Sequence, residues 1–227
     1  MRKRFRARVV NIQAGNWTHR NFGLAVDIGT TTVYGQLLDL NTGQVLAEAG
    51  DYNSQMSYGE DVISRIIHAE KSGGLELMQS LVVSTINGII EKLLESCGVS
   101  RDEISSITLA GNTTMTHLFL GLELHNIRRS PYIPVSTFFP PARARDDLGL
   151  DLERHAVALV FPAVSSYVGG DIVAGIMGSG MYRTDAQTLF IDNGKTRFKG
   201  NQISSLMTYR SLKKYQVFLI SKSRKNQ

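Results

Sequence analysis

The residues from Asp27 to Thr32 combine an acid, a glycine and three successive threonines in a pattern that could bind phosphate. Asp27 ends an apolar run, and Gly29 allows the backbone to turn tightly. Thr30, Thr31 and Thr32 then offer N–H groups and hydroxyls that can surround a phosphate, while Asp27 could hold Mg²⁺ through water. A plain hairpin with β-favouring threonines fits the same residues, so this motif alone leaves both interpretations open.

A second stretch repeats the beginning of this pattern. The run LFIDNG, which ends at Gly194, has the same strand–Asp–x–Gly form as LAVDIG near the front of the chain. A phosphate chain held between two lobes needs one hairpin from each, so Asp192 and Gly194 are predicted to begin the second one. Chance is the alternative, since strand–Asp–Gly turns are common.

Further polar groups lie at the starts of predicted helices. Asn112, Thr113 and Thr114 stand between a strand and a helix, where a helix N-terminus attracts anions, although ordinary capping explains them as well. Asp171 begins a glycine-rich helix and could position water or a metal ion; an acid placed favourably in a first turn is the simpler explanation. The histidines show no paired ligand spacing, and His117 is interpreted as a packing residue.

The elements that must position these residues follow from apolar periodicity. Strands are predicted over residues 22–28, 33–40, 44–49, 104–110, 156–161 and 188–192, and helices over 58–74, 75–97, 112–121 and 168–181. In the first helix Val62, Ile63, Ile66 and Ile67 lie at helical spacing; in the second, the apolar stripe is Leu75, Met78, Val82, Ile86, Ile89, Leu93 and Cys97, with Gly98 as the stop. Residues 122–155, with four of the five prolines, are predicted to be irregular, an insertion or lid. No element is predicted beyond residue 194.

Three antiparallel strands followed by two strand–helix crossovers predict the fold class. This order is that of a ribonuclease-H-like α/β lobe, with a mixed sheet and helices on both faces. We therefore expect a basic, disordered segment over residues 1–21, the lobe over 22–187, the start of a second lobe over 188–194, and a basic tail outside the folded unit over 195–227.

Charge and composition narrow the class of protein. Residues 1–20 carry six of the 25 basic residues and 195–227 carry nine, with no acid in either, so residues 21–194 hold the other ten and all 20 acids. Basic arms for nucleic acid are one interpretation, but no nucleic-acid signature accompanies them. No uninterrupted apolar run reaches the roughly 18 residues of a membrane span, and no signal peptide is recognised. With a single cysteine, Cys97, these features predict a cytoplasmic protein without membrane or nucleic-acid partners.

Six motifs, in order, resemble one known family. They are GLAVDIGTTTV, YGEDVISRI, GNTTMTHLFLG, PYIPV, VGGDIVAG and LFIDNG, and they cover about residues 22–194. Together they resemble the C-terminal ATPase part of the reductive activators of corrinoid proteins. These activators are ferredoxin-bearing members of the superfamily of acetate and sugar kinases, heat-shock chaperones and actin. The first motif is found across the superfamily, whereas the second and third are far more specific.

The resemblance implies an activity, its ligands and a set of site residues. Full-length members join an N-terminal [2Fe–2S] domain to a two-lobed ATP-binding domain and couple ATP hydrolysis to reduction of a cobalt(II) corrinoid. ATP, Mg²⁺ and a corrinoid protein are thus the implied ligands and partner, and a homodimer is compatible with the resemblance. Matched motif to motif, the first phosphate hairpin consists of Asp27, Gly29, Thr30, Thr31 and Thr32, and the second begins with Asp192 and Gly194. The cleft is lined by Asn112 to Thr114, and Asp171 orients water or Mg²⁺. The implied catalytic residues are Asp27 and Asp171.

The sequence departs from the family pattern at three places, and these departures change the activity that we expect. No cysteine cluster precedes residue 22, so the chain has no ligands for an iron–sulfur cluster. Thr116 stands where the family typically has a second histidine, and KTRFKG replaces a Thr-Asn-Gly-Glu run after LFIDNG. We expect an activator-family lobe whose second hairpin is cut off by a frameshift or premature end, with weak nucleotide binding and no turnover. A sugar- or acid-kinase-like phosphotransferase and a non-enzymatic module that binds a corrinoid or partner protein are the alternatives.

Overall fold

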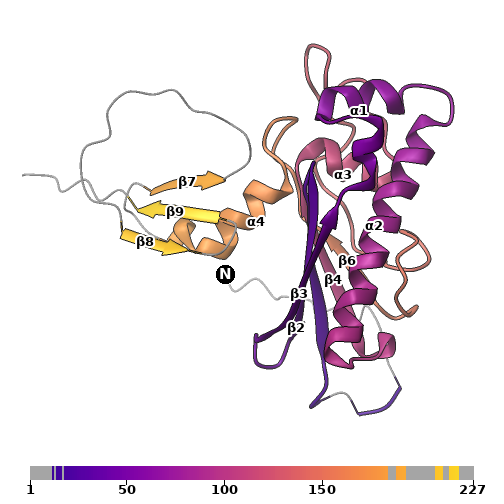
Figure 1. Ribbon diagram of the computed structural model, residues 1–227. Coiled ribbons are helices and arrows are strands. Elements are labelled where there is room, and N and C mark those ends of the chain that lie inside the picture. Colours follow the sequence, from indigo (N-terminus) through magenta and orange to yellow (C-terminus); the bar gives the residue numbers. More distant parts are fainter. Residues whose placement is uncertain are drawn as a thin grey trace, which may run out of the picture. The chain divides into compact units, whose positions relative to one another are not determined.

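The chain forms two compact units, Met1–Asp171 and Ile172–Gln227, in a computed structural model. The structure describes residues 12, 14–16, 18–183, 188–192, 208–211 and 215–219. The first unit contains a six-stranded sheet with helices packed on it, and the second contains a three-stranded sheet (Figure 1).

The sheet of the first unit is mixed, with the strand order β3-β2-β1-β4-β6-β5. Its strands are β1 (Phe22–Ile28), β2 (Thr32–Asp39), β3 (Val45–Tyr52), β4 (Ile104–Gly111), β5 (Ala142–Arg143) and β6 (Val157–Val160). β1, β2 and β3 form an antiparallel meander, whereas β4 runs parallel to β1, and β6 runs parallel to β4. This is the ribonuclease-H-like arrangement that the sequence predicts, so the α/β fold class with a mixed sheet is confirmed.

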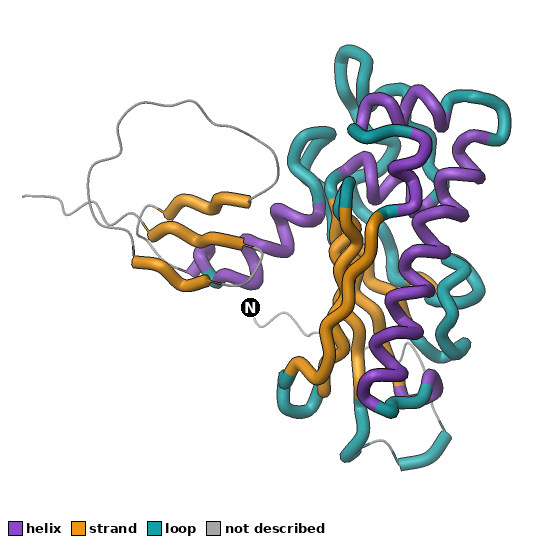
Figure 2. Tube along the Cα trace, in the orientation of Figure 1, coloured by secondary structure: helices purple, strands orange, loops and turns teal. Residues whose placement is uncertain are grey.

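Three helices lie on one face of this sheet, as Figures 1 and 2 show. They are α1 (Val62–Ala69), α2 (Gly74–Cys97) and α3 (Thr113–Leu120); two short 3-10 helices, η1 (Ser54–Tyr58) and η2 (Arg101–Glu103), flank them. α2 packs on β2 and β3, α3 packs on β4, and α1 contacts both α2 and α3. The fourth helix, α4 (Gly170–Ser179), begins in the first unit and continues into the second. A helix on the opposite face of the sheet therefore stays a prediction.

The core of the first unit lies between the sheet and the helices. Alternate residues of β1, namely Leu24, Val26 and Ile28, are buried, as strand periodicity requires. The predicted stripe of α2 is confirmed: Met78, Val82, Ile86, Ile89 and Leu93 are fully buried, and Leu75 and Cys97 pack at the edge of the core. By length and composition α2 could cross a membrane, but this burial is typical of a core helix in a folded domain.

The buried face of α1 includes a charged side chain. Ile63 and Ile67 are 48% and 46% exposed, whereas Arg65 is 0% exposed. The helix predicted from the spacing of Val62, Ile63, Ile66 and Ile67 is confirmed, but of these four only Ile66 is buried. The buried residues of this helix are Arg65, Ile66 and Ala69. The helix turns this face inward because the Arg65 guanidinium finds several buried hydrogen-bond acceptors there.

Residues 122–155 are mostly irregular, as predicted, apart from the short strand β5. They are not detached from the rest of the unit, because their apolar side chains belong to the same core. The buried members are Leu124, Ile127, Phe139, Ala144, Leu148, Leu150 and Leu152. A free lid would leave these side chains exposed, so the segment acts as part of the folded unit.

The second unit contains the rest of α4, a 3-10 helix η3 (Met181–Arg183) and an antiparallel sheet of order β7-β9-β8. Its strands are β7 (Thr188–Asp192), β8 (Thr208–Ser211) and β9 (Tyr215–Leu219). β7 lies where the sequence predicts a strand. The expectation that no element lies beyond residue 194 is wrong. β8 and β9 form there, from stretches with aromatic and β-branched residues. That β7 begins a second lobe stays a prediction.

Candidate functional site

The turn from Gly29 to Thr31 joins β1 to β2 beside the carboxyl end of the parallel strand β4, where Ile28 pairs with Gly111. Ligand sites of open α/β sheets gather at such carboxyl edges. A Cβ on Gly29 would lie only 2.4 Å from the carbonyl oxygen of Thr32. Gly29 does not have a positive φ, so close approach of the backbone is what requires a glycine here.

Three successive carbonyl oxygens of this turn accept hydrogen bonds from buried donors. Asn53 Nδ2 donates to Gly29 O at 3.0 Å, and the backbone N–H of Asn53 donates to Thr31 O at 2.9 Å. Between them, Arg65 Nη2 donates to Thr30 O at 2.6 Å. The carbonyl side of the turn is therefore fully bonded to the protein.

The amide groups of the same peptide units point the other way. In a trans peptide the N–H lies opposite to the C=O, and the one cis bond in the described part of the chain is Ser130–Pro131. The N–H groups of Thr30, Thr31 and Thr32 are therefore directed away from the buried donors. Those of Thr30 and Thr31 donate to no acceptor among the residues that the structure describes. A row of such donors is an anion-binding arrangement.

The donors belong to a buried group that we call the support cluster, which consists of Asn53, Gln55, Arg65 and Met115. All four residues are 0% exposed. Arg65 Nη1 donates to Gln55 Oε1 at 3.2 Å and lies 3.3 Å from Met115 Sδ, which is also 3.9 Å from Asn53 Nδ2. Gln55 in turn donates to the carbonyl oxygen of Met78 on α2 at 2.8 Å. The cluster thus connects the turn to three helices.

The motif YGEDVISRI forms the local structure that presents Arg65. Asp61 is the N-cap of α1, and it shares a capping box with Ser64. The hydrogen bonds from Ser64 lower the pKa of Asp61. The carbonyl oxygen of Gly59 accepts from Arg65 Nε at 2.8 Å, and a Cβ on Gly59 would lie 2.5 Å from Ser64 Oγ. Asp61 therefore fixes the start of α1.

The predicted residues at the start of α3 lie beside the turn. Asn112 caps α3 by accepting from Met115 N at 2.9 Å, and its Nδ2 donates to Thr30 Oγ1 at 3.1 Å. Asn112 is therefore both a helix cap and a neighbour of the predicted phosphate hairpin. Thr113 is 1% exposed and donates from its hydroxyl to Ser165 O at 2.6 Å, so this hydroxyl is turned into the protein.

The two predicted catalytic acids approach the same edge of the sheet. Asp27 pairs with Tyr34 in the β1–β2 ladder, and strand alternation places its side chain on the face opposite α1–α3. Asp171 is the second residue of α4 and follows Gly169 by two positions; a Cβ on Gly169 would lie 2.5 Å from Asn112 Cα. The chain segment that carries Asp171 therefore lies against the start of α3.

The second predicted hairpin is only partly described. Asp192 is the last residue of β7, in the second unit, and Gly194 lies outside the described residues. A clamp formed by both hairpins stays a prediction. In the described ranges no three His, Cys, Asp or Glu side chains gather as direct metal ligands; a water-mediated Mg²⁺ site at Asp27 does not need such a group.

His117 is a packing residue, as predicted. Its side chain is 0% exposed, its ring meets Phe139 edge-on, and its Nδ1 lies 2.8 Å from Thr113 O. Burial lowers the pKa of His117 below its ordinary value, so the ring is neutral at pH 7. These contacts give it no role at the turn.

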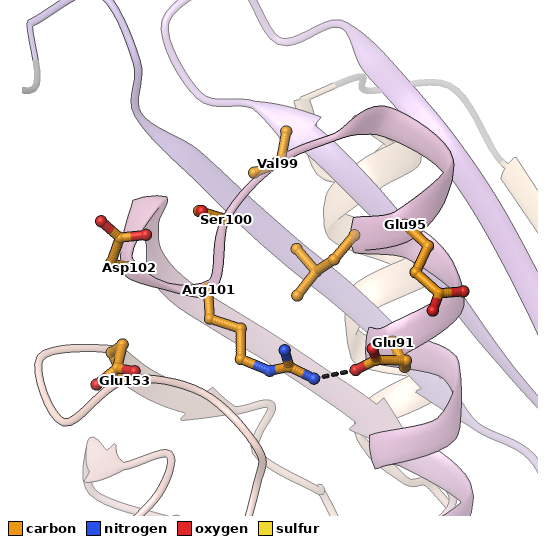
Figure 3. Close-up of a pocket in the computed structure, with 8 residues that line it drawn as sticks. Glu91, Glu95, Val99, Ser100, Arg101, Asp102 and Glu153 are labelled. Atoms are coloured by element: carbon orange, nitrogen blue, oxygen red, sulfur yellow. Dashed lines mark hydrogen bonds and ion pairs between the residues drawn. The ribbon is translucent and has the colours of Figure 1, made fainter.

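A cavity of about 510 Å³ lies at the other end of the sheet, beside the residues that precede β4. Figure 3 shows Arg101 in this cavity, extended toward Glu91, with which it forms an ion pair. Arg101 Nη2 also lies 2.9 Å from Asp151 Oδ2. The cavity contains none of the predicted site residues, and its central cation is already paired.

The sequence profile of the RACo middle region family matches residues 22–184. The chain belongs to the RACo middle region family. The corrinoid activation enzyme RamQ of Eubacterium limosum is 30% identical to it over 174 residues, which are 76% of this chain and 29% of RamQ. A solved structure, the reductive activator for corrinoid, iron-sulfur protein, is 45% identical with a TM-score of 0.73, and the match covers 76% of this chain and 27% of that one.

The predicted resemblance to reductive activators of corrinoid proteins is thereby confirmed, and the family's description places the matched residues in a middle region. The chain spans less than a third of the length of either relative. Within this RACo middle region the two most specific motifs meet at the turn. YGEDVISRI supplies Arg65, and GNTTM supplies Asn112 and Met115.

Proposed function

We propose that this chain is the nucleotide-binding lobe of an ATP-dependent reductive activator of corrinoid proteins. The observation that carries the proposal is the turn whose carbonyl oxygens are bonded to Asn53 and Arg65 while the following amides point away. An oligophosphate matches a row of N–H donors beside a capped helix start. Membership of the RACo middle region family, and two relatives named as activators, support the same function.

Each site residue has a role in this proposal. The amides of Thr30, Thr31 and Thr32 would hold phosphate oxygens, and Asn112 would fix the Thr30 hydroxyl. Asp27 would hold Mg²⁺ through water, and Asp171 would orient a water molecule. Mg²⁺ would neutralise part of the phosphate charge. The single Cys97 cannot hold an iron–sulfur cluster, so the contribution of this chain to corrinoid reduction would be the nucleotide.

Asp27→Asn is expected to weaken binding of Mg·ATP about tenfold or more, because one charge-assisted interaction contributes about 1.5–3 kcal/mol. Binding of ATP in the presence of a chelator should change little, since the carboxylate acts through Mg²⁺. Isothermal titration calorimetry on the 227-residue chain measures both. Turnover should be undetectable, because one hairpin holds a triphosphate from one side only.

The control is Asp39→Asn, at the far end of β2, where the acid bonds within its own turn. Wild-type affinity of Asp27→Asn for Mg·ATP would exclude the proposed role of Asp27. Steady hydrolysis that depends on Asp27 would contradict the view that one hairpin is insufficient. No binding of any nucleotide or oligophosphate would exclude the proposed function itself.

A partner-binding module is the second candidate, and exposed apolar side chains favour it. Two loops carry Tyr132, Ile133, Val135, Phe138, Val164 and Tyr167, each between 44% and 76% exposed. The loops are joined by Ser166 Oγ, which donates to Tyr132 O at 2.6 Å. Such apolar surface is typical of an interaction site, and a corrinoid protein is the proposed occupant.

Phe138→Ser is expected to weaken retention of a corrinoid protein in a pull-down without nucleotide, because Phe138 is 71% exposed and contributes apolar contact area. Leu40→Ser, at a separate exposed position on the turn after β2, is the control. Equal retention by both variants would mean that the loops contact another part of the activator and not a corrinoid protein. No observation in the described part of the chain favours the phosphotransferase alternative.

A further inference from the structure

Arg65 carries a buried charge that forms no direct ion pair with any of the described residues. Its side chain is 0% exposed, and it donates to the carbonyl oxygens of Gly59 and Thr30 and to Gln55 Oε1. All of these acceptors are neutral, and none of the ion pairs among the described residues includes Arg65. Buried charges are normally paired, because removing an uncompensated ion from water is costly.

The charge is permanent at neutral pH. Burial lowers the pKa of Arg65 to about 10, and the charge of Asp61 opposes this change. Asp61 is exposed and is engaged as the N-cap of α1, so it does not neutralise the guanidinium by direct contact. The turn between β1 and β2 therefore has a positive charge fixed behind it.

One peptide unit separates this charge from the open side of the turn. Arg65 Nη2 bonds to Thr30 O, and the N–H of the same peptide unit, that of Thr31, points the opposite way. A cation on the carbonyl oxygen polarises the peptide and makes its N–H a stronger donor. An anion that accepts from Thr31 would thus be attracted by both the N–H and the charge behind it.

We propose that Arg65 is a positioning residue for phosphate. Arg65 fixes the direction of the Thr31 N–H, and an oligophosphate on the other side of the turn balances its buried charge. This inference rests on the proposed function, since it requires that the turn binds phosphate. It adds that affinity at the turn rises with the negative charge of the ligand, and that the motif YGEDVISRI provides this selectivity.

The test compares Arg65→Met with the wild-type chain, using orthophosphate, pyrophosphate and tripolyphosphate at constant ionic strength. Arg65→Met keeps an apolar stem and removes the charge. We expect its affinity to fall on the order of tenfold for orthophosphate and a hundredfold for tripolyphosphate, because the lost Coulomb attraction scales with ligand charge. Calorimetric titration gives the three affinities for each protein.

Arg101→Met is the matched control, because Arg101 pairs with Glu91 and Asp151 at the other end of the sheet. It should keep the wild-type dependence on ligand charge. A purely structural role of Arg65 would lower the melting temperature and reduce all three affinities by the same factor, and that result overturns the proposal. So does an unchanged set of affinities.

If Arg65→Met does not fold, NMR on the wild-type chain tests whether Arg65 and Thr31 respond together to phosphate. During titration with tripolyphosphate, the Arg65 Nε–Hε signal and the Thr31 amide signal should shift with the same midpoint. A shift of Thr31 with an unmoved Arg65 signal overturns this inference and leaves the proposed function intact. If none of the amides of Thr30, Thr31 and Thr32 responds to any ligand, both are wrong, because the turn is then not an anion site.

Discussion

Gly29→Ala is expected to reduce binding of Mg·ATP below detection while the chain remains folded. The added Cβ would lie 2.4 Å from the backbone oxygen of Thr32, which is closer than Cβ atoms approach non-bonded atoms in real structures. The turn cannot yield easily, because Asn53 and Arg65 hold the carbonyl oxygens of Gly29 and Thr30. The amides that follow must therefore change direction.

The expected size of the effect follows from the bonds that are misdirected. Two charge-assisted hydrogen bonds to phosphate, each worth about 1.5–3 kcal/mol, correspond to a loss in affinity of roughly a hundredfold to ten-thousandfold. Overpacking of the turn should also lower the free energy of unfolding by about 1–3 kcal/mol. Calorimetric titration and urea denaturation measure the two effects separately.

Gly88→Ala is the matched control, since nothing lies within 4 Å of the position of its Cβ on α2. Alanine is a better helix former than glycine, so this variant should be as stable as the wild type or slightly more stable. It should bind Mg·ATP normally. If Gly29→Ala also binds normally, the turn between β1 and β2 is not the phosphate site.

Elements with strong periodicity could be predicted from the sequence because burial repeats along them. The stripe of α2 and the alternation of β1 each point to one buried face, and Gly98, with φ 61°, ends α2 as predicted. The positions of Gly29 and Asn112 were also predictable, because a glycine after a strand and a capping residue before a helix act locally.

The support cluster could not be predicted because its contacts are not local. Asn53 and Arg65 lie 24 and 35 residues from the backbone oxygens they bind, and no periodic pattern connects positions so far apart. A lone arginine on a short helix is normally assigned to the surface, since arginine is rarely buried without a partner. The one available signal was its place beside Ile66 in a family-specific motif.

The same reasoning explains why Ile63 and Ile67 are exposed although they share the helical spacing of Ile66. Apolar spacing in α1 fits two overlapping stripes, and tertiary contacts of Arg65 choose the stripe that contains Ile66. Arg65 takes the buried position because its hydrogen bonds to Thr30 O and Gly59 O are available only on the buried side. Long-range hydrogen bonding thus overrides the hydrophobic pattern at this helix.

Asn53→Leu is expected to lower the free energy of unfolding by about 2–6 kcal/mol and to weaken Mg·ATP binding. Leucine has the same number and branching of side-chain heavy atoms, so no cavity is left and lost hydrogen bonds dominate the cost. Gly29 O loses its donor, and Gln55 N loses the Asn53 Oδ1 acceptor, at 3.0 Å in each case. Each buried group left without a partner costs about 1–3 kcal/mol.

Asn87→Leu provides a control with the same bonding pattern at an exposed place. Asn87 Nδ2 donates to Gly149 O at 3.1 Å, and its Oδ1 accepts from Asp151 N at 2.8 Å. Water can replace these bonds, so the change in the free energy of unfolding should stay within about 0.5–1 kcal/mol, and nucleotide binding should not change. Urea denaturation and calorimetric titration of both variants make the comparison. Equal destabilisation by the two substitutions would mean that water reaches the carbonyl side of the turn, and the amides of Thr30 and Thr31 would then not be held in one direction by buried donors.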